Sequence, residues 1–113
     1  MEKKFIIEEL KKICPSKKED IEEYCEDFSE IYLHLIFGDI LNPYMLELLN
    51  NIQENAEQLT KIAELLEAMA KDCDYNQEVV VTTVLERLND DENVINNFKL
   101  FAGENTLKFI DDL

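Results

Sequence analysis

The chain has 113 residues, of which 46% are hydrophobic, and a formal net charge of −15. This length and composition predict one folded domain with its own core, and they exclude the disordered class of low hydrophobicity and high charge. A strongly acidic surface repels nucleic acid and anionic lipid and attracts basic protein surfaces, so direct nucleic-acid or membrane binding is not expected.

The excess of acid is regional. From Glu19 to Thr60 there are eleven acidic residues and no lysine or arginine, whereas the first 18 residues carry six lysines and three glutamates. At its start the chain has only a three-residue apolar run, too short for a signal peptide. The longest apolar stretch, Ile31 to Phe37, is far shorter than the ~20 residues of a membrane span. We therefore expect a cytoplasmic protein.

Two helices are predicted at the start of the chain. The first has one apolar face, formed by Phe5, Ile6, Leu10, Ile13 and Cys14, and Pro15 ends it. Ser16 and Glu19 then predict a capping box that begins the second helix. The inward side of this second helix consists of Ile21, Tyr24, Cys25 and Phe28. Its acids point mostly to solvent, and they are Glu19, Asp20, Glu22, Glu23, Glu26, Asp27 and Glu30.

The stretch from Ile31 to Leu41 is apolar nearly all round and predicts a central helix that ends near Gly38. Asn42 and Pro43 predict a restart, with the asparagine as N-cap and the proline at the first helical position. The face of that next helix is formed by Tyr44, Met45, Leu48, Leu49 and Ile52.

The clearest helical periodicity runs from Ile52 to Ala70. On its outer face, Glu57 with Lys61 and Glu67 with Lys71 form i,i+4 pairs worth ~0.2 to 0.5 kcal/mol each.

Val79 to Val84 is β-branched and favours a strand by propensity. A strand there would have no partner, so we predict a helix capped by Asp74 or Asn76.

A break at Asn89 to Glu92 precedes a seventh apolar face that ends at Gly103, read as a C′ glycine. A final apolar face, formed by Leu107, Phe109, Ile110 and Leu113, closes the chain. These elements predict a single all-α domain, residues 1–113, of seven to eight short helices. Stacked antiparallel hairpins resembling a short α-solenoid are favoured, with an irregular bundle as the alternative.

The sequence shows no recognisable set of catalytic residues. The single histidine, His34, lies in an apolar run and is interpreted as a core residue, and two glycines cannot build a phosphate loop. Three cysteines, Cys14, Cys25 and Cys73, form no CxxC pair and are interpreted as buried thiols. We therefore expect no enzymatic activity, no cofactor and no metal.

Asp72 to Glu78 places oxygen ligands at alternate positions, as an EF-hand loop does. The pattern then fails, because Gln77 stands where that loop needs glycine and Thr83 where it needs glutamate. An inter-helix loop with capping acids is the favoured interpretation.

Three segments carry a resemblance to a known group of proteins: Phe37–Leu41, Val84–Glu92 and Phe101–Thr106. Together they resemble a family of small all-helical bacterial proteins that look like immunity proteins, the cytosolic partners that neutralise toxins of rival cells. The resemblance covers roughly residues 28 to 113 and implies no catalytic residues.

The sequence thus leads to the hypothesis of an immunity protein that binds a basic toxin domain. Tyr24, Tyr44 and Tyr75 are candidate anchors. The predicted contact residues are the seven acids of the second helix together with Tyr44, Asp72, Asp74, Tyr75, Asp90 and Asp91. The alternative is a non-catalytic helical scaffold or adaptor whose charge maintains solubility.

Overall fold

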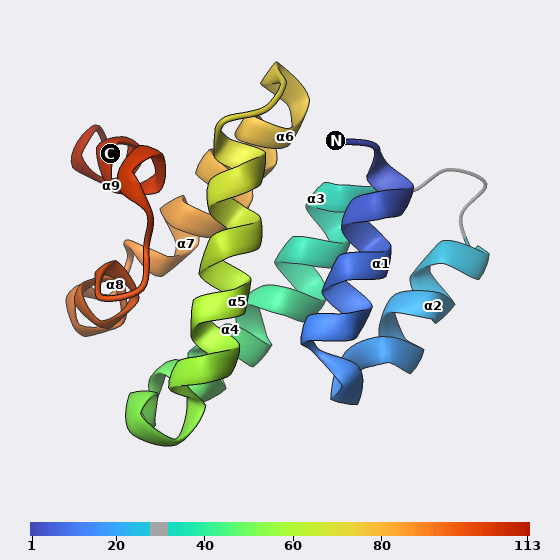
Figure 1. Cartoon of the computed structure of the whole chain (residues 1–113), viewed down its shortest axis with the longest axis horizontal. Helices are drawn as coiled ribbons and strands as arrows, with labels where there is room; N and C mark the ends of the chain where they lie inside the picture. The colour runs from blue at the N-terminus through green and yellow to red at the C-terminus, as the bar shows by residue number, and fades with distance from the viewer. Residues whose placement is uncertain (28–31) are drawn as a thin grey trace.

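The computed structural model describes residues 1–27 and 32–113, with the backbone only of Asp27 (Figure 1). The predicted positions of Phe28, Glu30 and Ile31 lie outside the described residues. Within the described residues all regular structure is helical, which confirms the all-α class. The helical segments are α1 (Lys3–Ile13), η1 (Pro15–Lys17), α2 (Lys18–Asp27), α3 (Leu33–Ile36), η2 (Phe37–Leu41), α4 (Asn42–Leu49), α5 (Ile52–Ala70), α6 (Asp74–Glu78), η3 (Val79–Leu85), α7 (Glu86–Leu88), α8 (Glu92–Lys99) and α9 (Glu104–Asp111).

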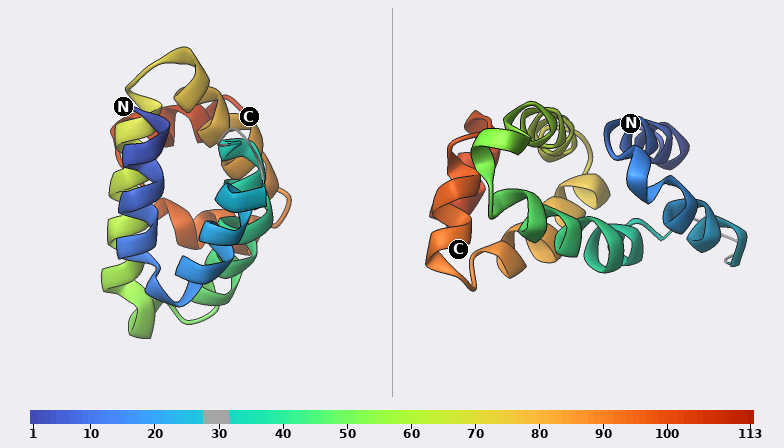
Figure 2. Two further views of the ribbon diagram at one scale, coloured as in Figure 1. Left: turned by 90° about the vertical axis from the view of Figure 1, so that its right-hand side faces the viewer. Right: turned by 90° about the horizontal axis from the view of Figure 1, so that it is seen from below.

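The long helix α5 organises the fold. It contacts α1, α4, α6 and α9, with α1 and α2 on one flank and α8 and α9 on the other (Figures 1 and 2). The predicted bounds of this helix are confirmed, and its core face of Leu59, Ile62, Leu66 and Met69 is fully buried. Because the other helices differ in length and cross α5 in several directions, the architecture is an irregular bundle.

The first helix ends before Pro15, as predicted, and buries Ile6, Ile7 and Leu10. Phe5 was expected on the same face, but 52% of its surface is exposed. The predicted capping box is wrong. Pro15 starts the 3₁₀ turn η1, so Ser16 is already inside helical structure when α2 begins at Lys18.

The predicted restart at Asn42 and Pro43 is also wrong, because α3, η2 and α4 form one continuous helix. Asn42 has helical backbone angles, φ −58° and ψ −49°, and its N–H donates to the carbonyl of Phe37, five residues earlier. In this π-helical register the backbone N–H of residue 43 would donate to the carbonyl of Gly38, but Pro43 has no N–H. The Nη1 atom of Arg87 donates to that carbonyl instead, at 3.0 Å. A distant side chain thus compensates for the proline.

The valine-rich run is helical, as predicted, and it forms the π-helical segment η3 within the continuous helix α6–η3–α7. Its predicted caps are wrong. The N-cap position belongs to Cys73, Asp74 is the first helical residue, and Asn76 is buried with its amide hydrogen-bonded. The two π-helical segments, η2 and η3, pack against each other.

Gly103 was predicted to end the helix before it, but α8 ends at Lys99. Gly103 is the N-cap of α9, with φ −78°, so it is not in the left-handed conformation of a C′ glycine. A side chain here would collide with Glu67, since a Cβ atom would lie 2.5 Å from the Glu67 Cδ. An alanine here would therefore have to displace the Glu67 carboxylate.

Within the described residues, no helix combines the length and the apolarity that a membrane crossing requires.

Candidate protein-docking site

Helix α2 displays five of the thirteen predicted contact residues on one face. Ile21 fixes the helix to the body of the molecule because its side chain is fully buried, and Tyr24 and Cys25 pack half-buried beside it. The opposite face is turned to solvent, so Glu19, Asp20, Glu23 and Glu26 are exposed and Glu22 is partly exposed. We call these five residues the α2 acidic face.

Four members of this face, Glu19, Glu22, Glu23 and Glu26, line one shallow, open depression. They are spaced three and four residues apart, which places their carboxylates next to one another on the helix surface. Like charges at these spacings repel, so the arrangement opposes helix formation and favours a cationic partner. Among the predicted contact residues, these are the ones that the fold brings together.

Three of the six lysines in residues 1–18 contact groups other than the α2 acids. Lys11 Nζ lies 2.9 Å from the Glu8 carboxylate, Lys3 Nζ lies 4.7 Å from the Tyr75 ring centroid, and Lys17 Nζ lies 5.3 Å from that of Tyr44. Between residues that the structure describes, no ion pair joins an α2 carboxylate to a lysine. The pKa of Lys11 is raised, chiefly by its hydrogen bond to Glu8, with a smaller contribution from the negative charge of Glu22.

Tyr24 borders the α2 acidic face, and its hydroxyl donates to Asp39 Oδ2 at 3.0 Å. That hydrogen bond is the largest cause of the raised Tyr24 pKa. Of the three candidate anchors, Tyr24 thus connects the acidic helix to a further carboxylate on η2.

Tyr44 and Tyr75 serve packing within the domain. The Tyr44 hydroxyl accepts from Gln58 Nε2 at 2.9 Å. The Tyr75 ring meets His34 edge-on, with 5.6 Å between the ring centroids. Both tyrosines are half-buried against the core.

The remaining predicted acids lie away from α2. Asp72 and Asp74 lie where α5 turns into α6, and Asp90 and Asp91 lie between α7 and α8, on the flank opposite α2 (Figures 1 and 2). Asp91 caps α8 by accepting from two backbone N–H groups. The predicted contact set is therefore not one surface, and the Asp27 side chain and Glu30 are outside the described residues.

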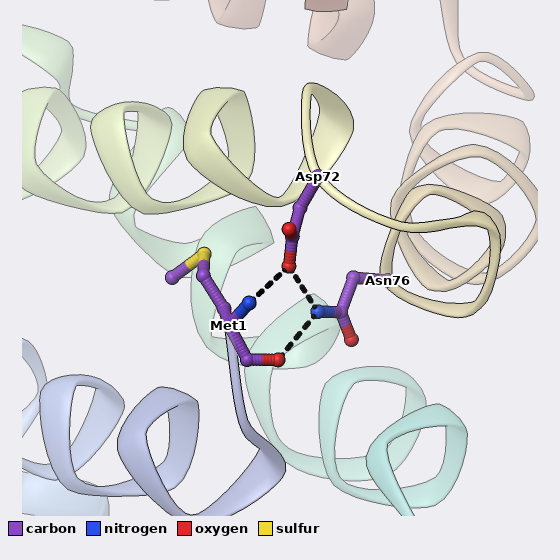
Figure 3. Close-up of polar contacts among 3 residues, drawn as sticks. All are labelled: Met1, Asp72 and Asn76. Carbon is purple, nitrogen blue, oxygen red and sulfur yellow. Dashed lines mark hydrogen bonds and ion pairs between the residues drawn. The ribbon is translucent and has the colours of Figure 1, made fainter.

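Asp72 has a structural role (Figure 3). Its Oδ2 atom accepts from the Met1 ammonium group at 2.5 Å and from Asn76 Nδ2 at 2.8 Å. The bond to Met1 is the largest cause of the lowered Asp72 pKa. In the EF-hand-like segment this carboxylate thus binds the first residue of the chain. Residues 1–27 and 32–113 contain no cluster of three His, Cys, Asp or Glu that could bind a metal ion.

Glu67 was predicted to pair with Lys71, but both its oxygens bind the start of α9. They accept from the backbone N–H groups of Asn105 and Thr106, at 3.0 and 2.8 Å, and from both side chains at 2.8 Å. Burial of the carboxylate raises its pKa, but these hydrogen bonds outweigh burial and lower the pKa to about 2. The other predicted pair, Glu57 with Lys61, is confirmed at 3.5 Å.

A second polar cluster lies where α3 and α4, the helices before and after η2, meet η3. His34 Nδ1 lies 2.5 Å from Thr83 Oγ1, and Asn42 Nδ2 donates to the Thr83 carbonyl at 2.7 Å. Asn42 is 5% exposed. His34 is therefore a packed, hydrogen-bonded residue, in line with its interpretation from the sequence. Asn42 was predicted only as an N-cap, and its hydrogen bond to Thr83 was not predicted because the two residues lie 41 positions apart along the chain.

The fold and the α2 acidic face define a small all-α protein that presents a cluster of carboxylates on one helix. Residues 7–112 match the model of the family described as domain of unknown function (DUF7674), and the chain belongs to that family. Neither the curated proteins nor the solved structures give a match.

Proposed function

We propose that this protein is an immunity protein that binds and neutralises a basic toxin domain through the α2 acidic face. The supporting observation is that its carboxylates are clustered and turned to solvent while three of the neighbouring lysines, Lys3, Lys11 and Lys17, contact other groups. Such a surface raises the rate of encounter with a cationic partner at low salt. The resemblance of three helical segments to immunity proteins supports the same class of function.

Charge reversal separates this proposal from the scaffold alternative. The test variant replaces Glu19, Glu22, Glu23 and Glu26 with lysine. A control variant makes the same change at four exposed acids elsewhere, Glu47, Glu64, Glu78 and Glu86, so both variants have equal net charge. Each is co-expressed with the product of the adjacent open reading frame, tested as the candidate toxin.

We expect the parent and the control to protect the cell and the α2 variant to lose protection. Circular dichroism must show that both variants are folded. Toxicity that is unchanged by co-expression of the parent protein would reject the function. Equal protection by both variants would reject the α2 acidic face as the binding surface and favour a scaffold whose charge serves solubility.

A further inference from the structure

A groove follows the line of contact between α1 and α5, on the flank of α1 away from α2. Two adjoining depressions form it, and they share Ile13 and Lys61 as lining residues. The two helices run antiparallel (Figures 1 and 2), so the groove has straight helical walls. We call these two depressions the α1/α5 groove.

The end of the groove near the start of α1 is apolar. Phe5, Ile13, Leu65 and Ala68 line it together with Met1. Phe5 is 52% exposed and Met1 38%, and the core face of α1 is complete without Phe5. An exposed aromatic ring in an apolar depression is the type of side chain that anchors a docked partner.

The rim of the groove is mainly acidic. It carries Glu9 and Glu64 at the apolar end and Glu54 and Glu57 at the other end, against Lys12 and Lys61. One of these two lysines, Lys61, already pairs with Glu57 at 3.5 Å. The uncompensated charge of the rim is therefore negative and favours a cationic occupant.

We propose that the α1/α5 groove binds a basic amphipathic helix of another protein. A seam between two antiparallel helices accepts a third helix laid along it, with apolar residues at i, i+3, i+4 and i+7 facing inward. From Glu54 to Ala68 the groove is about 20 Å long, enough for about four helical turns. Lysine or arginine flanking the apolar stripe would meet the acidic rim.

A second copy of this chain is a poorer occupant, because two molecules with a net charge of −15 repel each other. The groove is also separate from the α2 acidic face, so this proposal does not depend on the proposed function. Reversing the α2 charges should leave peptide binding in the groove largely intact.

The probe is a synthetic peptide of about 18 residues, made of leucine and lysine with the leucines on one helical face. An isomer of the same composition with dispersed leucines is the control peptide. Affinity is measured by fluorescence anisotropy for the full chain, for Phe5→Ser, and for the matched control Leu100→Ser, whose side chain is 69% exposed and outside the groove. Amide NMR shifts locate the bound peptide.

We expect Phe5→Ser to weaken binding about tenfold or more and Leu100→Ser about twofold or less. The isomer should bind about tenfold more weakly than the amphipathic peptide, and the shifts should map to α1 and α5. Equal binding of the two peptides, equal effects of the two substitutions, or shifts confined to α2 would overturn the proposal. So would a dimer of the free protein, seen by sedimentation, that Phe5→Ser dissociates.

Discussion

Replacing Glu67 with glutamine tests how α9 is held to the rest of the domain. The carboxylate is partly buried and accepts four hydrogen bonds from Asn105 and Thr106, two on each oxygen. In glutamine one oxygen becomes an NH₂ group, which faces two donors whichever way the amide is turned. The substitution keeps the shape of the side chain but removes the charge and at least one good acceptor.

The pKa of Glu67 sets the size of the effect. A pKa lowered from 4.5 to about 2 corresponds to a ceiling of about 3 kcal/mol of folding free energy. Because the carboxylate is partly exposed, its actual contribution to the folding free energy is smaller than this ceiling. Removing hydrogen bonds to a charged acceptor at the start of a helix costs a free energy of the same order. We expect Glu67→Gln to destabilise the protein by about 2 kcal/mol at pH 7, a large share of the stability of a small domain.

The pH dependence makes the test specific. Because the folded pKa lies below the unfolded one, the contribution of Glu67 is complete above pH 4.5 and is lost as the pH falls toward 2. The difference between parent and Glu67→Gln should therefore shrink to below about 1 kcal/mol at pH 3. Urea unfolding followed by circular dichroism at both pH values measures it, with the exposed Glu64→Gln as control. A penalty that is equal at both pH values, or no larger than that of the control, would refute the reasoning.

Four further results are expected. Gly103→Ala should destabilise the protein by about 2 kcal/mol, because the new Cβ would displace the Glu67 carboxylate. For the same reason the losses of stability from Gly103→Ala and Glu67→Gln should not be additive. Arg87→Met should lower the free energy of unfolding by about 1 kcal/mol in the parent. In a Pro43→Ala background the loss should be smaller, because residue 43 then has an N–H that can donate to the same Gly38 carbonyl. A urea double-mutant cycle measures both losses, and additive losses would contradict this. Burial raises the pKa of the Cys14 thiol to about 11, so Cys14 should react with a thiol reagent only on unfolding, whereas Cys73 is exposed and should react at once. Raising the salt concentration should raise Tm, and it should do so less when the acids of the α2 acidic face are neutralised to glutamine or asparagine. Equal salt dependence would contradict mutual repulsion on α2.

The sequence predicted those parts of the fold that depend on local signals. Ile52 to Ala70 was predicted within its bounds because apolar periodicity over many turns specifies a helix and its buried face. The valine run was assigned to a helix against its propensity because a lone strand would leave its backbone unpaired. The α2 acids could likewise be predicted as a surface, since a helix with Ile21 inside must turn the residues of its opposite side outward.

What the sequence could not predict depends on contacts across long separations. Asn42 and Pro43 have the composition of a helix start, but the helix continues through them, and the guanidinium of Arg87 donates to the carbonyl that Pro43 leaves without an N–H. Glu67 fits an i,i+4 pair with Lys71, but its four donors lie thirty-eight and thirty-nine positions away. Phe5 has the spacing of a core residue, yet the groove beside α5 leaves it open to solvent. In each case a tertiary contact overrides a correct local rule.

The contrast between Glu67 and the α2 acidic face explains why the latter is the better guide to function. A carboxylate that stabilises the fold is recognised by its donors: Glu67 has four and Asp91 has two. The described α2 carboxylates join no ion pair between described residues, and at their spacings they repel one another. Net charge for solubility could be spread over the whole surface with less repulsion. The cationic partner that we propose would convert the repulsion within α2 into attraction across an interface.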